Sequence, residues 1–109
     1  METQKKQIVL IVDDSLLICE QIKAALKDTP IFICEAHNGQ EAVNMVENYQ
    51  PDLILLDVVL PDADGYSLFD KLKKADKNDA VIIFLTSKDK DEDVVKGFSM
   101  GACDYIKKP

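Results

Sequence analysis

The stretch that decides the fold is LILLDVVLPDADGY, residues 53–66. It begins with four consecutive large apolar residues, the pattern of a strand buried on both faces of a parallel sheet. The run stops at Asp57, and Pro61 and Gly65 then shape a tight turn, since proline fixes φ and glycine tolerates tight backbone geometry. The segment predicts a strand, a short loop and the start of a helix, with a carboxylate where the strand ends.

The same alternation extends in both directions from this segment. Apolar stretches of strand length alternate with stretches whose apolar residues recur at helical spacing, and the connections are short. Such alternation predicts an α/β domain with a parallel sheet and helices on both faces. The expected strands are 8–12, 31–36, 53–56, 81–85 and 103–107, and the expected helices are one that opens at Ser15 and is stopped by Pro30, then 39–49, 65–74 and 91–100.

The helices that cover a sheet turn an apolar side toward it. In the first helix Glu20 and Lys23 are expected to face outward. The residues expected on the core-facing sides are Leu16, Leu17, Ile22, Ala25 and Leu26 in the first helix, Ala42, Val43 and Val46 in the second, and Leu68, Phe69 and Leu72 in the third.

Composition sets limits on partners. The 109 residues suit a single domain, and 13 basic against 20 acidic residues give a net charge of −7. That charge repels nucleic acid backbones and anionic membranes, so direct binding to either is not expected. The three cysteines, Cys19, Cys34 and Cys103, are far apart and form no CxxC pair, which predicts reduced thiols in a cytoplasmic protein. No signal peptide or membrane-spanning run is evident.

Polar residues follow four of the five expected strands, and the carboxyl ends of parallel strands are where sites form in open α/β sheets. Three carboxylates, a hydroxyl and an ammonium are therefore expected to meet at one edge of the sheet. These residues are Asp13 and Asp14, then Asp57, then Thr86 with Ser87, and finally Lys107 with Lys108.

Three adjacent carboxylates repel one another unless a cation neutralises them, and Mg²⁺ prefers such oxygen ligands. The rigid loop is expected to hold the backbone carbonyl of Val59 near the same cation. A carboxylate beside a metal can act as a nucleophile and form an acyl phosphate. The hydroxyl and the ammonium would then bind the other phosphoryl oxygens.

Four segments, IVDDS at 11–15, LILLDVVLPDADGY at 53–66, FLTSK at 84–88 and GACDYIKKP at 101–109, resemble a response-regulator receiver domain of two-component signalling. The resemblance covers essentially the whole chain and belongs to the chemotaxis-receiver-like superfamily. It implies a flavodoxin-like doubly wound sheet of five strands in the order 2-1-3-4-5.

The resemblance also implies a role for each site residue. Asp57 would be the phosphoacceptor, and its donor would be a histidine kinase or a phosphotransfer protein. The metal, Mg²⁺ or Mn²⁺, would be held by Asp13, Asp14, Asp57 and the backbone oxygen of Val59. The remaining assignments are Thr86 as the switch hydroxyl, Tyr105 as the aromatic switch that follows it, and Lys108 as the phosphate-binding lysine.

Receivers of this type have a fifth helix, which is absent from a chain that stops at Pro109, so residues 1–109 are expected to be a single receiver domain truncated after its fifth strand. A fused or separate output domain is expected, and the oligomeric state stays open.

The alternative function is an unphosphorylated pseudo-receiver that acts as an interaction module. An FMN carrier would need a phosphate-cradling loop after the first strand, where this chain has Asp13 and Asp14. An aspartyl-phosphate hydrolase would need a D-x-D-x-T motif after a strand, and residues 57–61 do not match it.

Overall fold

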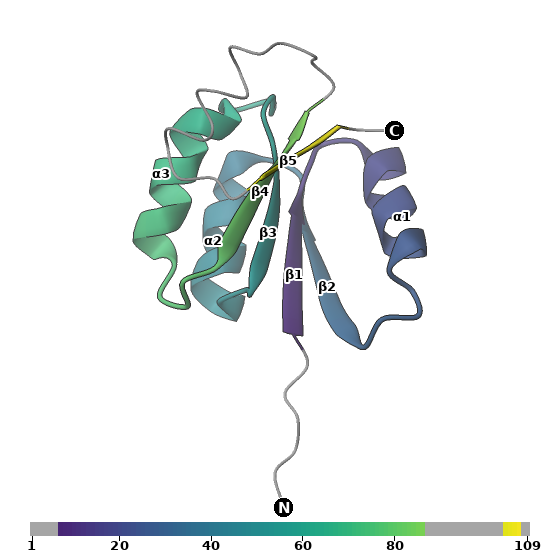
Figure 1. Cartoon of the computed structure of the whole chain (residues 1–109). Helices are drawn as coiled ribbons and strands as arrows, with labels where there is room; N and C mark the ends of the chain where they lie inside the picture. The colour runs from purple at the N-terminus through teal and green to yellow at the C-terminus, as the bar shows by residue number, and fades with distance from the viewer. Residues whose placement is uncertain (1–6, 87–103, 108–109) are drawn as a thin grey trace, which may run out of the picture.

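The structure, a computed structural model, describes residues 7–86 and 104–107, with side chains up to Leu85. Five strands form one parallel sheet in the order β2-β1-β3-β4-β5, which confirms the expected topology (Figure 1). The helix expected at 91–100 lies outside the described residues. The elements are β1 (Gln7–Val12), α1 (Leu16–Ala25), β2 (Ile31–Ala36), α2 (Gly39–Tyr49), β3 (Leu53–Asp57), α3 (Gly65–Ala75), β4 (Val81–Thr86) and β5 (Asp104–Lys107).

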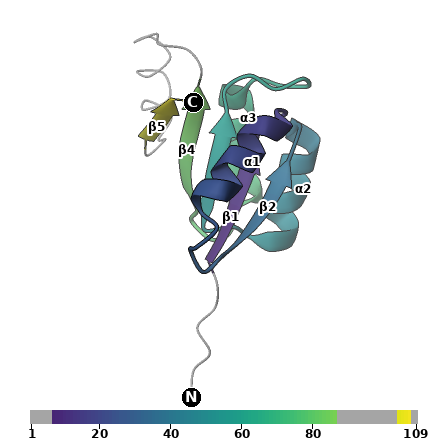
Figure 2. The ribbon, with the colours of Figure 1, turned by 90° about the vertical axis from the view of Figure 1, so that its right-hand side faces the viewer.

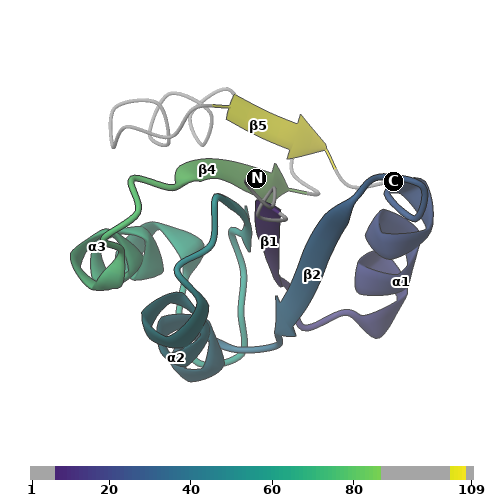
Figure 3. The ribbon, with the colours of Figure 1, turned by 90° about the horizontal axis from the view of Figure 1, so that it is seen from below.

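The described helices cover the sheet unequally. Figures 2 and 3 show α2 and α3 side by side on one face and α1 alone on the other. Strand side chains alternate between the two faces, and two separate apolar clusters result. None of the described helices has the length and hydropathy that a bilayer span requires.

The face covered by α2 and α3 holds the larger cluster. Phe84 of β4 lies at its centre, with ring centroids 5.1 Å from Tyr66 and 5.7 Å from Phe69. The helix residues expected to face the core do so, since Ala42, Val46, Leu68, Phe69 and Leu72 are buried and Val43 packs against them.

The face covered by α1 differs from expectation. Leu16 and Leu17 are 67% and 66% exposed, and Cys19 is the one buried residue of the helix. Cys19 and Ile22 lie three residues apart and pack on the sheet, whereas Leu17 projects from nearly the opposite side of the helix. The prediction that Leu16, Leu17 and Ala25 face the core is wrong. The side of α1 that contacts the sheet is narrower than the run of apolar residues along the helix.

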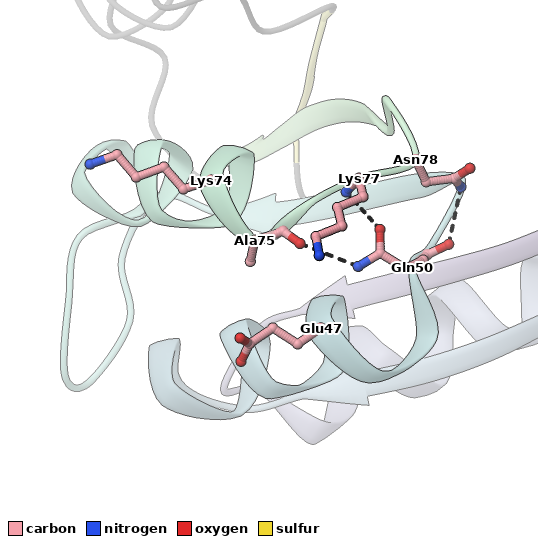
Figure 4. A pocket seen from close by; sticks show the side chains of 6 residues that line it. All are labelled: Glu47, Gln50, Lys74, Ala75, Lys77 and Asn78. Atoms are coloured by element: carbon pink, nitrogen blue, oxygen red, sulfur yellow. Dashed lines mark hydrogen bonds between the residues drawn. The ribbon is translucent and has the colours of Figure 1, made fainter.

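A groove lies between the ends of α2 and α3 at the amino ends of the strands, and Gln50 spans it (Figure 4). Gln50 ends α2 in the left-handed conformation at φ 46°. Its side-chain nitrogen donates to the carbonyl of Ala75 at 3.2 Å, and its side-chain oxygen accepts from the backbone of Lys77 at 2.6 Å. These bonds join the ends of α2 and α3, so the polar residues that line this groove are explained by the contact between the two helices.

Two leucine substitutions measure the difference between the two faces. Leu72→Ala removes a fully buried side chain from the larger cluster and is expected to lower the free energy of unfolding by about 2–5 kcal/mol. Leu17→Ala removes the same atoms from an exposed position and is expected to change it by less than about 0.5 kcal/mol. Urea unfolding of both variants checks this, and equal losses would contradict the assigned burial.

Candidate metal centre

Three carboxylates meet where β1 and β3 end. Because β1 and β3 are neighbours paired in register, Asp13 and Asp57 leave the sheet side by side. Oxygen atoms of Asp13, Asp14 and Asp57 all lie within 4.8 Å of one another. Asp13 is fully buried and Asp57 is 4% exposed, whereas Asp14 is exposed and lies on the solvent side of the group.

Backbone amides hold two of these carboxylates in place. The backbone N–H of Ser15 donates to Asp13 Oδ1 at 2.9 Å, and that of Val59 donates to Asp57 Oδ1 at 3.2 Å. Ser15 is also the N-cap of α1, since its hydroxyl accepts from the backbone of Ile18 at 3.3 Å. Asp14 therefore does not serve as the helix cap.

The loop after Asp57 is closely packed on the end of β3. The N–H of Gly65 donates to the carbonyl of Val58 at 2.7 Å. A Cβ on Gly65 would overlap the carbonyl oxygen of Asp57 and lie 2.9 Å from Val58 Cα. Glycine is therefore required here by close approach. An antiparallel bridge between Val59 and Asp64 also holds the two arms of the loop together.

Asp62 anchors this loop to the start of α2, a contact that sequence reasoning missed. Its two carboxylate oxygens accept from the backbone N–H groups of Gly39 at 2.7 Å and Gln40 at 3.2 Å. The hydrogen bond from Gly39 is the main reason that the pKa of Asp62 is lowered, and the positive end of the helix dipole suits an anion there. Asp62 is 23 positions from Gly39 and 22 from Gln40, so no local sequence pattern indicates this contact.

The remaining predicted site residues are described only in part. Thr86 is the last residue of β4 and pairs with Lys107, one step beyond the pair of Asp57 and Leu85. Tyr105 pairs with Phe84 of β4. The side chains of Thr86 and Tyr105, and all of Lys108, lie outside the described residues, so their roles stay predictions.

The donor set fits a hard divalent cation. Three carboxylates whose oxygens lie within 4.8 Å of one another repel, and a cation bound by these oxygens removes that cost. Asp14 offers an exposed ligand through which such a cation could enter. The carboxylates are therefore suited to a Mg²⁺ or Mn²⁺ ion.

Comparisons with known proteins agree with this geometry. Residues 9–109 match the family model described as response regulator receiver domain, and the chain belongs to that family. It is 36% identical over 102 residues to the "Probable transcriptional regulator ycf29" of Porphyra purpurea, covering 93% of this chain and 49% of that protein. The chain thus spans about half the length of the curated relatives it matches.

Solved structures show the same fold. A two-component response regulator from Clostridium difficile superposes with a TM-score of 0.88 at 29% identity, covering 95% of this chain and 84% of that one. A response regulator protein from Burkholderia pseudomallei, solved with a phosphorylated aspartic acid, a calcium ion and citrate, gives a TM-score of 0.85 at 25% identity, covering 95% and 61%.

Two glycine substitutions test the packing of the loop. Gly65→Ala is expected to lower the free energy of unfolding by about 1–3 kcal/mol, because the new methyl group meets backbone atoms that cannot move aside. Gly39→Ala is the matched control, since its methyl group would meet mainly the side chain of Asp62, at 3.2 Å. Chemical denaturation of both measures the difference, and a Gly65→Ala chain as stable as Gly39→Ala would contradict this account.

Proposed function

We propose that this receiver domain accepts a phosphoryl group on Asp57 from the phosphohistidine of a histidine kinase or phosphotransfer protein. The observation that supports the proposal most is the meeting of Asp13, Asp14 and Asp57 within 4.8 Å at the end of β1 and β3. Isolated carboxylates at strand ends are common, but three of them on neighbouring strands require a counter-charge.

The transfer exchanges one bond for another. A carboxylate oxygen of Asp57 attacks phosphorus and the P–N bond to the donor imidazole breaks, so that the ring, already protonated on its other nitrogen, leaves as neutral imidazole. Asp57 thereby becomes an acyl phosphate. The backbone N–H of Val59 holds the second carboxylate oxygen and so orients the nucleophile. A bound Mg²⁺ supplies charge neutralisation for the phosphoryl oxygens, and Asp13 and Asp14 are the residues that would hold it.

The signal would be read at the ends of β4 and β5. We propose that Thr86 binds a phosphoryl oxygen through its hydroxyl, that Lys108 pairs with another, and that Tyr105 follows the movement of Thr86. The pairing of β4 with β5 supports this, because it joins the backbones that carry Thr86 and Tyr105. The carbonyl of Val59 completes the proposed set of metal ligands.

The output lies with other domains in this proposal. Curated relatives are about twice as long as this chain and are named as transcriptional regulators, which supports a DNA-binding output domain that is fused or separate. Residues 1–109 would belong to one receiver domain. The acidic charge of −7 argues against nucleic acid binding by the receiver itself, and reduced thiols favour a cytoplasmic location.

A phosphorylation assay tests the central claim. Incubation with acetyl phosphate and Mg²⁺ is expected to add one phosphoryl group to the intact chain, seen by mass spectrometry, and Asp57→Asn is expected to abolish the adduct. Asp70→Asn, an exposed acid on α3, is the control and should be modified normally. An adduct that persists in Asp57→Asn would assign the phosphoacceptor to another residue, and no adduct in any chain would favour the pseudo-receiver alternative.

Titration with Mg²⁺ tests the metal ligands separately. Asp14→Asn is expected to weaken binding by about tenfold or more, since it removes one of three charges from the site without changing a buried group. Glu20→Gln, an exposed acid on α1, should bind as the unaltered chain does. Amide chemical shifts near Asp57 report the binding, and equal affinities in both variants would exclude Asp14 as a ligand.

A further inference from the structure

A second group of metal-ligating side chains lies on the α1 side of the sheet, next to the site described above. Cys19 of α1, Glu35 of β2 and His37 just beyond β2 each offer one ligand atom, and these atoms lie within 4.8 Å of one another. Glu35 and His37 are two positions apart, so they project from the same face of the sheet. Cys19 is the buried residue with which α1 contacts that face.

We propose that Cys19, Glu35 and His37 form a binding site for a zinc-class divalent cation. Zinc combines thiolate, imidazole and carboxylate ligands and is four-coordinate in most protein sites. Its bond lengths place neighbouring ligand atoms about 3.3–3.8 Å apart. His37 Nε2 and Glu35 Oε1 are already 3.3 Å apart. Since the ligand atoms of all three residues lie within 4.8 Å of one another, a small movement of the thiol would complete three corners of a tetrahedron.

A carboxylate lies at the His37 ring nitrogen that would not bind the metal, as is usual for metal-binding histidines. The second ring nitrogen, Nδ1, lies 3.5 Å from Oε1 of Glu41 on α2. Glu41 is itself fixed by Asn38, the N-cap of α2, whose amide donates to Glu41 Oε2 at 2.8 Å. A carboxylate on the far nitrogen sets the ring orientation and strengthens the other nitrogen as a ligand.

Lys23 is the partner of Glu35 in this structure and would compete with a metal ion for the Glu35 carboxylate. Its ammonium forms an ion pair with Glu35 and lies 3.4 Å from Glu20, an exposed acid on the same helix. That ion pair also lowers the pKa of Glu35, so the carboxylate is ionised. A cation at the site would displace the Lys23 ammonium toward Glu20, which the flexible lysine side chain allows.

The thiol supplies a proton on binding. Burial, with the neighbouring Glu35 and Asp13 carboxylates, raises the pKa of Cys19 to about 12. Zinc-class ions bind the thiolate form of cysteine, so binding at this site would exchange the thiol proton of Cys19 for a metal–sulfur bond. One proton is released for each ion bound.

Cobalt(II), a spectroscopic substitute for zinc, tests the site in the full chain with excess Mg²⁺ present at the aspartates. A 1:1 complex with a near-ultraviolet thiolate-to-cobalt band is expected, and Zn²⁺ should displace the cobalt. Cys19→Ala should remove the band, and Cys34→Ala, which alters the other described thiol, should retain it.

Partly exposed residues make the test independent of folding defects. His37→Gln should weaken binding by about tenfold or more, Glu41→Gln by about tenfold, and Lys23→Gln should tighten it by removing the competitor. The melting temperature should rise with Zn²⁺ in the unaltered chain and rise less at the same Zn²⁺ concentration in His37→Gln. The proposal is overturned if no thiolate band forms, or if His37→Gln binds Co²⁺ as tightly as the unaltered chain.

Discussion

The parallel pairing of β1 with β3 is the constraint on which the site depends. Val12 lies opposite Leu56, so the next residues, Asp13 and Asp57, leave the sheet together. A slip of one residue would move every side chain of a strand to the other face and separate the two acids. The buried apolar residues of both strands specify that register, so the core that stabilises the fold also sets the spacing of the carboxylates.

Holding these acids together costs free energy, and the backbone offsets part of it. Amides of Ser15 and Val59 donate to Asp13 and Asp57 from the first turns of the loops that follow the strands. Each loop is in turn fixed elsewhere: Ser15 caps α1, and Asp62 ties the longer loop to the start of α2. The remaining repulsion is what a divalent cation would relieve, which couples the loop geometry to metal binding.

Sequence alone predicted the parallel sheet and the three acids because both depend on local patterns: apolar runs of strand length and the residues directly after them. It failed for Leu16 and Leu17, because an apolar residue on a short helix does not reveal how wide the contact with the sheet is. The contact of Asp62 was missed, and Cys19 was interpreted only as a reduced thiol, because their partners are distant in the chain and meet them only after the strands have paired. Glu35 and His37 carried a weak signal, two metal ligands two positions apart near a strand end.

The two faces of the sheet differ in how densely they are packed. The α2 and α3 side holds the dense aromatic cluster around Phe84, which makes it the stable part of the molecule. The α1 side is thinner, with Cys19 as the single buried helix residue, and elements with few buried contacts open at low free energy. The N–H that holds Asp13 belongs to the cap of α1, so α1 and the acidic site share one residue, whereas the loop that Asp62 anchors separates α3 from the site.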